Sequence, residues 1–186
     1  PDSSLIIQVN VADASSLPEL FLPPIIDELQ AAGVQDSRVK LIATSGVRPR
    51  PSFDDAKSRL GDRVSNRFTV VQHDPTDDAA LKPLGSTRRG TGVYLNRDYL
   101  TTDVRILTGE IGFHAYAGYS GGRESIAFDL SGISTLTQLH GLLPLGESRS
   151  GVLDANPVHE EMMEVAELAP QAFAVNLVRD IAGNAV

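Results

Sequence analysis

The residues best suited to chemistry lie in one stretch, Gly109–Ser125, which reads GEIGFHAYAGYSGGRES. It holds one imidazole, His114, whose ordinary pKa near neutrality suits proton transfer. A turn with three glycines follows, and glycines let backbone N–H groups approach a phosphate or a cofactor closely. Arg123 and Glu124 close the stretch with opposite charges. These residue types indicate either a ligand-binding turn or a tight structural turn, and the stretch alone leaves both open.

The remaining histidines are weaker candidates. His73 follows a predicted strand, where a histidine more often forms a loop hydrogen bond than takes part in catalysis. His140 falls on a predicted helix and by position alone is typical of a polar helix face. His159, Glu160 and Glu161 stand in the first turns of another predicted helix and are expected to form a solvated face. Residue type and local pattern therefore favour His114.

Apolar segments predict the elements that must position these residues. Strands are expected at Leu5–Val11, Val39–Ala43, Phe68–Gln72, Val93–Leu95, Val104–Thr108 and Phe173–Val178. Helices are expected at Ile25–Ala32 after Pro23-Pro24, at Phe53–Leu60 capped by Ser52, from Ser134 to Leu143, and from Pro157 to Leu168 capped by Asn156. The segment Ala79–Thr91 is expected to be irregular, since proline and glycines interrupt it.

The alternation of strands and helices predicts an α/β fold with a mostly parallel, Rossmann-like sheet flanked by helices. In such sheets ligands collect at the carboxyl ends of the strands. The loop Thr44–Pro51 follows a predicted strand and is a site candidate on position alone.

Composition limits the classes of function. A chain of 186 residues suits a single domain over residues 1–186, and we expect a cytoplasmic protein. The formal net charge of −8 argues against nucleic acid as a partner, and the adjacent pair Arg88-Arg89 is expected in a solvated loop. The absence of cysteine excludes disulfides and thiolate metal sites. No signal peptide is visible, and no apolar run approaches the roughly 20 residues of a membrane span.

The central stretch resembles the signature of the lactate racemase family, the nickel-pincer-dependent racemases, in their N-terminal domain. The matching residues are His114, the turn Ala117–Gly122, Arg123 and Ser125. Further matches in family order are Ala43–Gly46, His73-Asp74, Leu84–Thr87, Gly90-Thr91, Val93 to Arg97, Gly151–Leu153 and Asn156–Val158. The resemblance covers nearly the whole chain. It implies the family's α/β fold and a second, C-terminal domain that this chain lacks. The chain starts at Pro1, so we expect a trimmed form or a fragment.

The resemblance also implies a cofactor, a pyridinium mononucleotide that carries nickel in a sulfur–carbon–sulfur pincer. In the family a lysine attaches it covalently, one histidine binds the nickel, and two histidines act as general acid and base on a 2-hydroxy acid. By resemblance His114 corresponds to one catalytic histidine and His140 to the nickel ligand. The expected cofactor-binding residues are Asp13, Ser16, Ser120, Gly121, Gly122, Arg123, Glu124 and Ser125.

Three of these family positions carry other residues here. Glu124 stands in place of the attaching lysine, and a carboxylate cannot supply the amine of the covalent link. Val47 stands in place of the second catalytic histidine and cannot move a proton. Ser16, in the segment that begins at Asp13, replaces an arginine that could pair with a phosphate.

Two hypotheses follow. The first is a divergent racemase or epimerase of 2-hydroxy acids whose chemistry is altered or impaired, with a small 2-hydroxy acid or another small anion as ligand. The second is a non-catalytic domain of the same fold that binds a small anion or a nucleotide in a regulatory role. A generic nucleotide-binding α/β protein is disfavoured, because no dinucleotide or phosphate-loop motif follows the first strand.

Overall fold

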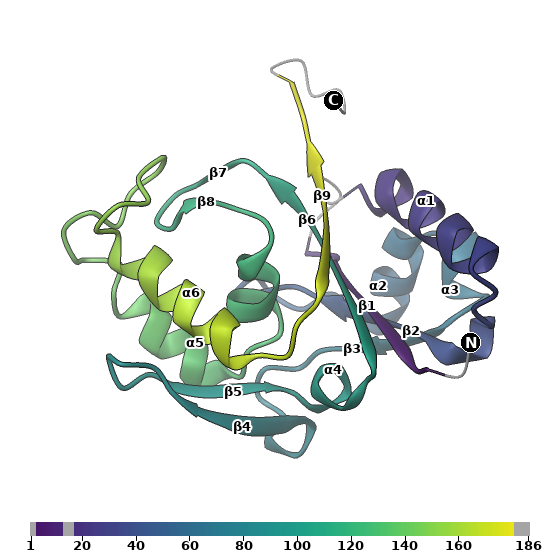
Figure 1. Ribbon diagram of the computed structural model, residues 1–186, viewed down its shortest axis with the longest axis horizontal. Helices are drawn as coiled ribbons and strands as arrows, with labels where there is room; N and C mark the ends of the chain where they lie inside the picture. Colours follow the sequence, from purple (N-terminus) through teal and green to yellow (C-terminus); the bar gives the residue numbers. More distant parts are fainter. Residues whose placement is uncertain (1–2, 13–16, 181–186) are drawn as a thin grey trace.

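A five-stranded parallel sheet forms the centre of the computed structural model, which describes residues 3–12 and 17–180 (Figure 1). The strand order is β3-β2-β1-β6-β9. The strands are β1 Leu5–Asn10, β2 Val39–Thr44, β3 Thr69–Gln72, β6 Val104–Ile111 and β9 Phe173–Val178. This arrangement confirms the predicted α/β fold with its parallel sheet.

The central strand β1 contributes side chains to two cores, one on each face of the sheet. Side chains alternate across a strand, so Leu5, Ile7 and Val9 face one side of the sheet and Ile6 faces the other. Both faces are covered, which explains why the strand is apolar almost throughout. Gln8 and Asn10 are the exceptions, and both side-chain amides, that of Gln8 fully buried, turn toward the candidate site described below.

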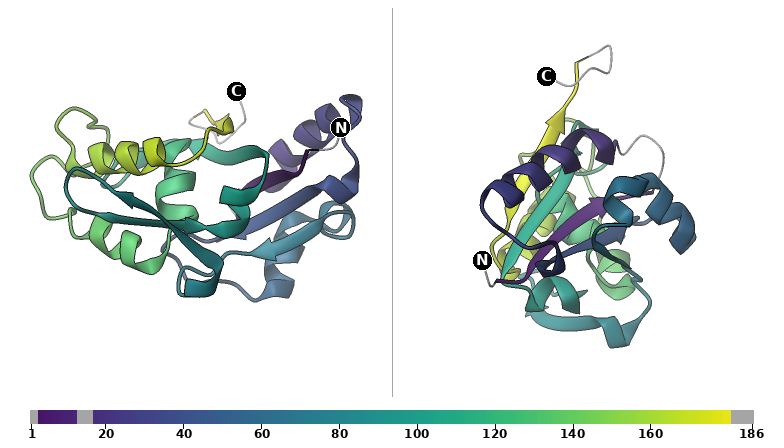
Figure 2. Two further views of the ribbon diagram at one scale, coloured as in Figure 1. Left: turned by 60° about the horizontal axis from the view of Figure 1, so that its bottom comes forward. Right: turned by 90° about the vertical axis from the view of Figure 1, so that its right-hand side faces the viewer.

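Helices α1 (Pro18–Ala31), α2 (Phe53–Leu60) and α3 (Asp62–Ser65) lie on one face of the sheet (Figures 1 and 2). The other face carries α4 (Arg97–Thr101), α5 (Ile133–His140), α6 (Pro157–Leu168) and the hairpin of β4 (Leu81–Ser86) and β5 (Gly92–Asn96). No helix in the described part of the chain is both long and apolar enough to cross a membrane.

Helix α1 begins seven residues before the predicted start, and the prediction of a boundary at the proline pair is wrong. Pro18 opens the helix, while Pro23 and Pro24 lie inside it. Both inner prolines are exposed, as are Glu19 and Leu20 one turn earlier. Solvent can therefore satisfy the carbonyl groups that lose a helical partner, which lowers the cost of an internal proline.

The segment predicted to be irregular instead contains β4, which pairs with β5 in an antiparallel hairpin. The register shifts between Pro83 and Gly85. Pro83 has no N–H to donate, and such a residue is tolerated at an edge or a bulge of a two-stranded ribbon. Tertiary pairing with β5 therefore outweighs the local turn signals.

The caps of three other helices were predictable to different degrees. Ser52 accepts a hydrogen bond from the Asp55 N–H at 3.1 Å, and Asn156 caps α6, as predicted. Helix α5, in contrast, starts at Ile133 after Gly132 and has no side-chain cap, so the prediction of Ser134 as its N-cap is wrong. It also ends at His140 rather than at Leu143, because tighter turns follow.

Candidate active site

A cavity of about 480 Å³ opens at the carboxyl ends of β1, β2 and β6. Its walls come from Asn10 of β1, the loop Ser45–Arg48 after β2, Thr108–Glu110 of β6, His114, Gly121, Glu124, Phe128, Asp129 and His140. The loop Thr44–Pro51 and the glycine turn, which are far apart in the sequence, meet here. This is the position at which open parallel sheets bind ligands.

His114 lies on the short strand β7 (Phe113–His114), which pairs with β8 (Gly118–Tyr119). Its Nδ1 accepts hydrogen bonds from the backbone N–H groups of Tyr116 at 3.2 Å and Ala117 at 3.0 Å. The neutral ring therefore carries its proton on Nε2, which lies 3.8 Å from Oε1 of Glu124. Burial lowers the pKa of His114, and the nearby Glu124 carboxylate opposes that shift.

The Phe128 ring connects the two histidines of the cavity. It stacks on His114 with the ring planes 4° apart and the centroids at 5.6 Å, and its centroid lies 5.4 Å from that of His140. Nδ1 of His140 donates to the Leu136 carbonyl at 2.6 Å, which leaves Nε2 with a lone pair in the neutral ring. That tautomer suits a metal ligand. Among the described residues, however, no group of three or more His, Cys, Asp or Glu side chains could hold a metal ion.

Glu124 turns back onto the glycine turn that precedes it. Its Oε2 accepts a hydrogen bond from the Gly121 N–H at 2.9 Å. A carboxylate of the protein thus occupies a backbone donor that a glycine turn could otherwise offer to a phosphate or another anion. The other oxygen of Glu124 remains beside His114.

The serines of the turn hold the backbone together. The Ser120 hydroxyl donates to the Glu110 carbonyl at 2.7 Å, and the Ser125 hydroxyl donates to the Thr108 carbonyl at 3.1 Å. Both serines also line the cavity. These bonds tie the turn to the end of β6.

Gly122 and Arg123 do not line the cavity. The Gly122 N–H donates to the side chain of Asn176 on β9 at 3.1 Å, while the Arg123 guanidinium lies near the Tyr119 carbonyl. Asp13 and Ser16 lie outside the described residues. The structure therefore brings together only part of the predicted site, namely His114, His140, Ser120, Gly121, Glu124 and Ser125.

Val47 stands on the wall of the same cavity, with 59% of its side chain exposed. An exposed valine offers no hydrogen bond, so this part of the wall is apolar. A polar group from another element lies beside Gly46 of that loop. A Cβ atom placed on Gly46 would lie 3.0 Å from Oδ1 of Asp129.

Sequence reasoning missed Asp129. It ends a five-residue π-helical turn, Ser125–Asp129, and is only 6% exposed. Its Oδ1 accepts from the Asn10 side-chain amide at 2.8 Å, and its Oδ2 accepts from the Gln8 amide at 2.9 Å. Burial, and next the Glu124 charge, raise the pKa of Asp129 well above its ordinary value. The available signal was one acidic residue inside the apolar run Ile126–Leu130.

His73 forms hydrogen bonds, as its position predicts. Its ring is buried and lies between the Ser131 carbonyl, 3.0 Å from Nε2, and the Asn96 side-chain amide, 3.2 Å from Nδ1. Nε2 therefore donates to the carbonyl and Nδ1 accepts from the amide. Burial lowers the pKa of His73, so the neutral ring is favoured.

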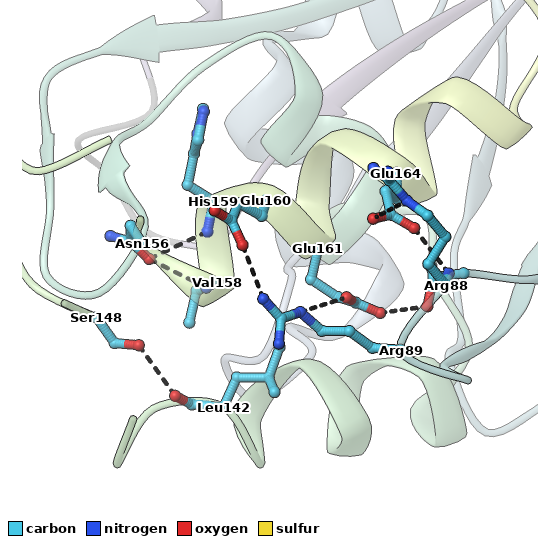
Figure 3. A network of polar contacts seen from close by, with 11 residues as sticks. Arg88, Arg89, Leu142, Ser148, Asn156, Val158, His159, Glu160, Glu161 and Glu164 are labelled. Carbon is cyan, nitrogen blue, oxygen red and sulfur yellow. Dashed lines mark hydrogen bonds and ion pairs between the residues drawn. The ribbon is translucent and has the colours of Figure 1, made fainter. Parts of the chain in front are cut away.

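A second polar cluster joins α6 to the loop between β4 and β5, and it corrects the prediction for Glu161 (Figure 3). Glu161 is fully buried rather than solvated, and it accepts a hydrogen bond from the Thr87 hydroxyl. Arg89 pairs with Glu160 at 2.7 Å and lies 3.4 Å from Glu161. Arg88 pairs with Glu164 at 2.9 Å. The basic pair thus lies in an exposed loop, as predicted, and its ion pairs with Glu160 and Glu164, together with the buried Thr87–Glu161 contact, form a clamp on α6.

The chain resembles known proteins along most of its length. The family model described as the lactate racemase N-terminal domain matches residues 7–152. The chain is 26% identical to a lactate racemase of Lactiplantibacillus plantarum over 166 residues, and this alignment covers 88% of the chain and 39% of the relative. It is 27% identical to a lactate racemase of Thermoanaerobacterium thermosaccharolyticum over 163 residues, and this alignment covers 87% of the chain and 38% of the relative.

Solved structures share the fold. The lactate racemase apoprotein of T. thermosaccharolyticum superposes with a TM-score of 0.88 at 24% identity, over 100% of this chain and 45% of that one. A Thermotoga maritima protein superposes with a TM-score of 0.76 at 15% identity, over 100% of this chain and 49% of that one. The chain thus spans about two fifths of the length of the curated relatives it matches.

Proposed function

The chain belongs to the lactate racemase family through its N-terminal domain, and from this premise we propose that its cavity binds a small 2-hydroxy acid for proton exchange at the substrate hydroxyl group. The observation that carries the proposal is the pair of His114 and Glu124. Nε2 and Oε1 are 3.8 Å apart, so a hydroxyl oxygen that lies to one side of the pair can be within hydrogen-bond distance of both atoms. The imidazole N–H then donates to that oxygen, and the carboxylate accepts its proton.

The geometry prepares both groups for these roles. Two backbone N–H groups fix the orientation of His114 and keep its proton on Nε2, and a neutral imidazole can polarise an oxygen as a donor. The Gly121 N–H fixes the Glu124 carboxylate through its other oxygen. A substrate hydroxyl therefore meets two groups that need little reorganisation.

The tethered form of the family cofactor does not fit these residues. The attachment needs an amine, and Glu124 instead presents a carboxylate that is bonded to the turn. His140 keeps a lone pair on Nε2 and could still meet a metal, but the described residues form no multi-ligand metal site. Proton exchange by His114 and Glu124 accordingly stands as the part of the chemistry that this chain's own residues support.

The curated relatives are longer than this chain, and their additional length suggests a partner for the cavity. We expect a second domain of the same protein to cover the open side of the cavity. Phe113, 77% exposed, and Tyr116, 43% exposed, both line that opening, and exposed aromatic side chains favour such a contact.

Calorimetric titration with L-lactate and D-lactate tests the proposal. The parent chain should bind at least one enantiomer, and His114→Asn should weaken binding about tenfold, because one buried hydrogen bond to the hydroxyl is lost. His159→Asn is the matched control, since His159 lies on α6 and does not line the cavity. Absence of binding to any small 2-hydroxy acid would refute the proposal.

The substitutions at Glu124 and Val47 also favour a second candidate, a binding domain without turnover. The same titration distinguishes the two when it is followed by chiral analysis of the recovered lactate. Loss of optical purity in lactate incubated with the chain and added nickel-pincer nucleotide, which would accept the C2 hydride, supports turnover, whereas exchange of the hydroxyl proton alone would leave the configuration unchanged. Tight binding with no chemical change after long incubation supports the binding domain.

A further inference from the structure

The buried carboxyl group of Asp129 has no role in the proton exchange described above, yet it lines the same cavity. It lies next to Gly46 at the carboxyl ends of β1 and β2. Among residues 3–12 and 17–180, no ion pair connects it to a cation, and its hydrogen-bond partners are neutral. A buried carboxylate without a cation is unfavourable, so this position favours the neutral acid.

The two amide partners of Asp129 are themselves held in one orientation. Oδ1 of Asn10 accepts the Ala12 N–H at 2.9 Å, and Oε1 of Gln8 accepts the Thr108 N–H at 3.2 Å. Neither amide can flip without losing a backbone partner, so both present N–H groups to the carboxyl. Each Asp129 oxygen therefore already accepts one amide hydrogen bond, and the Thr44 hydroxyl is a third side-chain partner of the carboxyl group. The proton of the neutral acid takes a direction that these three partners leave open.

The charges around the cavity define what that proton can meet. The titratable groups that line the cavity with Asp129 are Arg48 after β2, Glu110 on β6, His114 on β7, Glu124 after β8 and His140 on α5. Glu110 is neutralised by Arg179, whose two nitrogens lie 2.7 and 2.6 Å from its oxygens. An ionised Asp129 would add a second free negative charge beside Glu124 and repel an anionic ligand.

We propose that Asp129 is a recognition residue that donates a hydrogen bond from its neutral carboxyl group to the carboxylate of the bound 2-hydroxy acid. The inference rests on the proposed function and deepens it, because it assigns the acid group of the ligand as well as its hydroxyl group. His114 and Glu124 hold the hydroxyl, and Asp129 holds the carboxylate. The pair of contacts selects hydroxy acids over simple alcohols.

Proton linkage during lactate binding tests the assignment. Calorimetry of the parent between pH 5.5 and 8.5, in pairs of buffers with different ionisation enthalpies, should show net proton uptake that grows with pH. Affinity should then fall by up to tenfold per pH unit, because each binding event requires a protonated Asp129. Asp129→Asn should abolish the part of the uptake that belongs to Asp129, and Asp54→Asn, on the exposed surface of α2, should leave it unchanged.

The Asn variant places an amide opposite two fixed donors and can weaken the fold, so a second measurement uses the parent alone. The ¹³C resonance of the Asp129 carboxyl should titrate well above 3.8. A titration near 3.8, or lactate binding with the same pH dependence in parent and Asp129→Asn, overturns the assignment to Asp129 while leaving the proposed function intact. A parent that binds no hydroxy acid at any pH overturns both.

Discussion

Glu124 determines which chemistry the glycine turn can support. Its carboxylate bonds to the Gly121 N–H and lies beside His114, so a residue of the protein occupies a place suited to an external anion. Two histidines, His114 and His140, line the same cavity. A carboxylate at this position offers no amine through which a cofactor could be attached.

Replacing Glu124 with lysine should restore covalent attachment. We expect Glu124→Lys, co-expressed with the enzymes that make the nickel-pincer nucleotide, to gain the mass of the nucleotide, because the amine then projects into a cavity that retains both histidines. The parent should show no adduct. Glu124→Gln is the matched control, since it removes the charge without supplying an amine. Intact-mass spectrometry checks the result, and a covalent adduct on the parent would contradict it.

Two glycines of the same turn should differ sharply in their tolerance of a side chain. Gly118 has a φ of +80°, and a Cβ there would lie 2.3 Å from the Val152 carbonyl oxygen. Gly122 has a φ of +56° and open space around it. Gly118→Ala should lower the free energy of unfolding by at least about 3 kcal/mol, and Gly122→Ala by about 1 kcal/mol. Urea denaturation measures both, and equal losses would contradict the predicted backbone clash.

At the scale of elements, α6 is fixed to the β4–β5 loop by charged side chains of very different burial (Figure 3). Glu161 is fully buried and accepts the Thr87 hydroxyl, whereas Glu160 pairs with Arg89 at the surface. The clamp positions α6 against the face of the sheet that carries α5. Glu161, the buried residue of the clamp, should therefore contribute more to the free energy of unfolding than the exposed ion pairs do.

Alanine substitutions at Glu161 and Glu160 distinguish the contribution of the buried carboxylate from that of the exposed ion pair. Glu161→Ala should destabilise the fold by about 2–4 kcal/mol, because it opens a cavity and leaves the buried Thr87 hydroxyl without its partner. Glu160→Ala removes the other carboxylate next to Arg89 and should cost less than about 1 kcal/mol, since that pair is exposed. Thermal unfolding of both variants measures the two losses of stability. Similar losses would show that burial does not separate these residues.

At the scale of the whole molecule, stability should rise from pH 5 to pH 7.5. Burial lowers the pKa of His73, His114 and His159 below 6.5 in the folded state. The unfolded chain therefore binds protons near pH 6.5 that the folded chain does not bind, and the free energy of unfolding falls as the pH drops below that value. Urea denaturation across this range measures the slope, and a protein more stable at pH 5 than at pH 7.5 would contradict the prediction.

Asp129 acts in the opposite sense. Its pKa is raised in the folded state, so above pH 3.8 the unfolded chain loses a proton that the folded chain keeps, and this contribution weakens as pH rises. Between pH 5 and 6.5, three histidines act against this one carboxyl group. Asp129→Asn should consequently make the rise with pH steeper, which the same denaturation series records.

Much of the fold followed from local pattern. The apolar strands, the caps Ser52 and Asn156, and the alternation of elements predicted a parallel α/β sheet, because such signals act within a few residues of one another. The prolines of α1 and the hairpin strand β4 were mispredicted for the same reason: solvent exposure of one side of a helix, or pairing with a distant strand, outweighs the local preference.

The sequence by itself determined the family signature, the candidate His114 and the presence of a carboxylate rather than an amine at position 124, since these depend only on which residue stands at a position. The tertiary structure alone decided that Asp129 joins Gln8 and Asn10, and that Glu161 is buried. These contacts join residues 74 to 121 positions apart in the chain. A carboxyl group's ionisation depends on burial and on such distant partners, which no local pattern records.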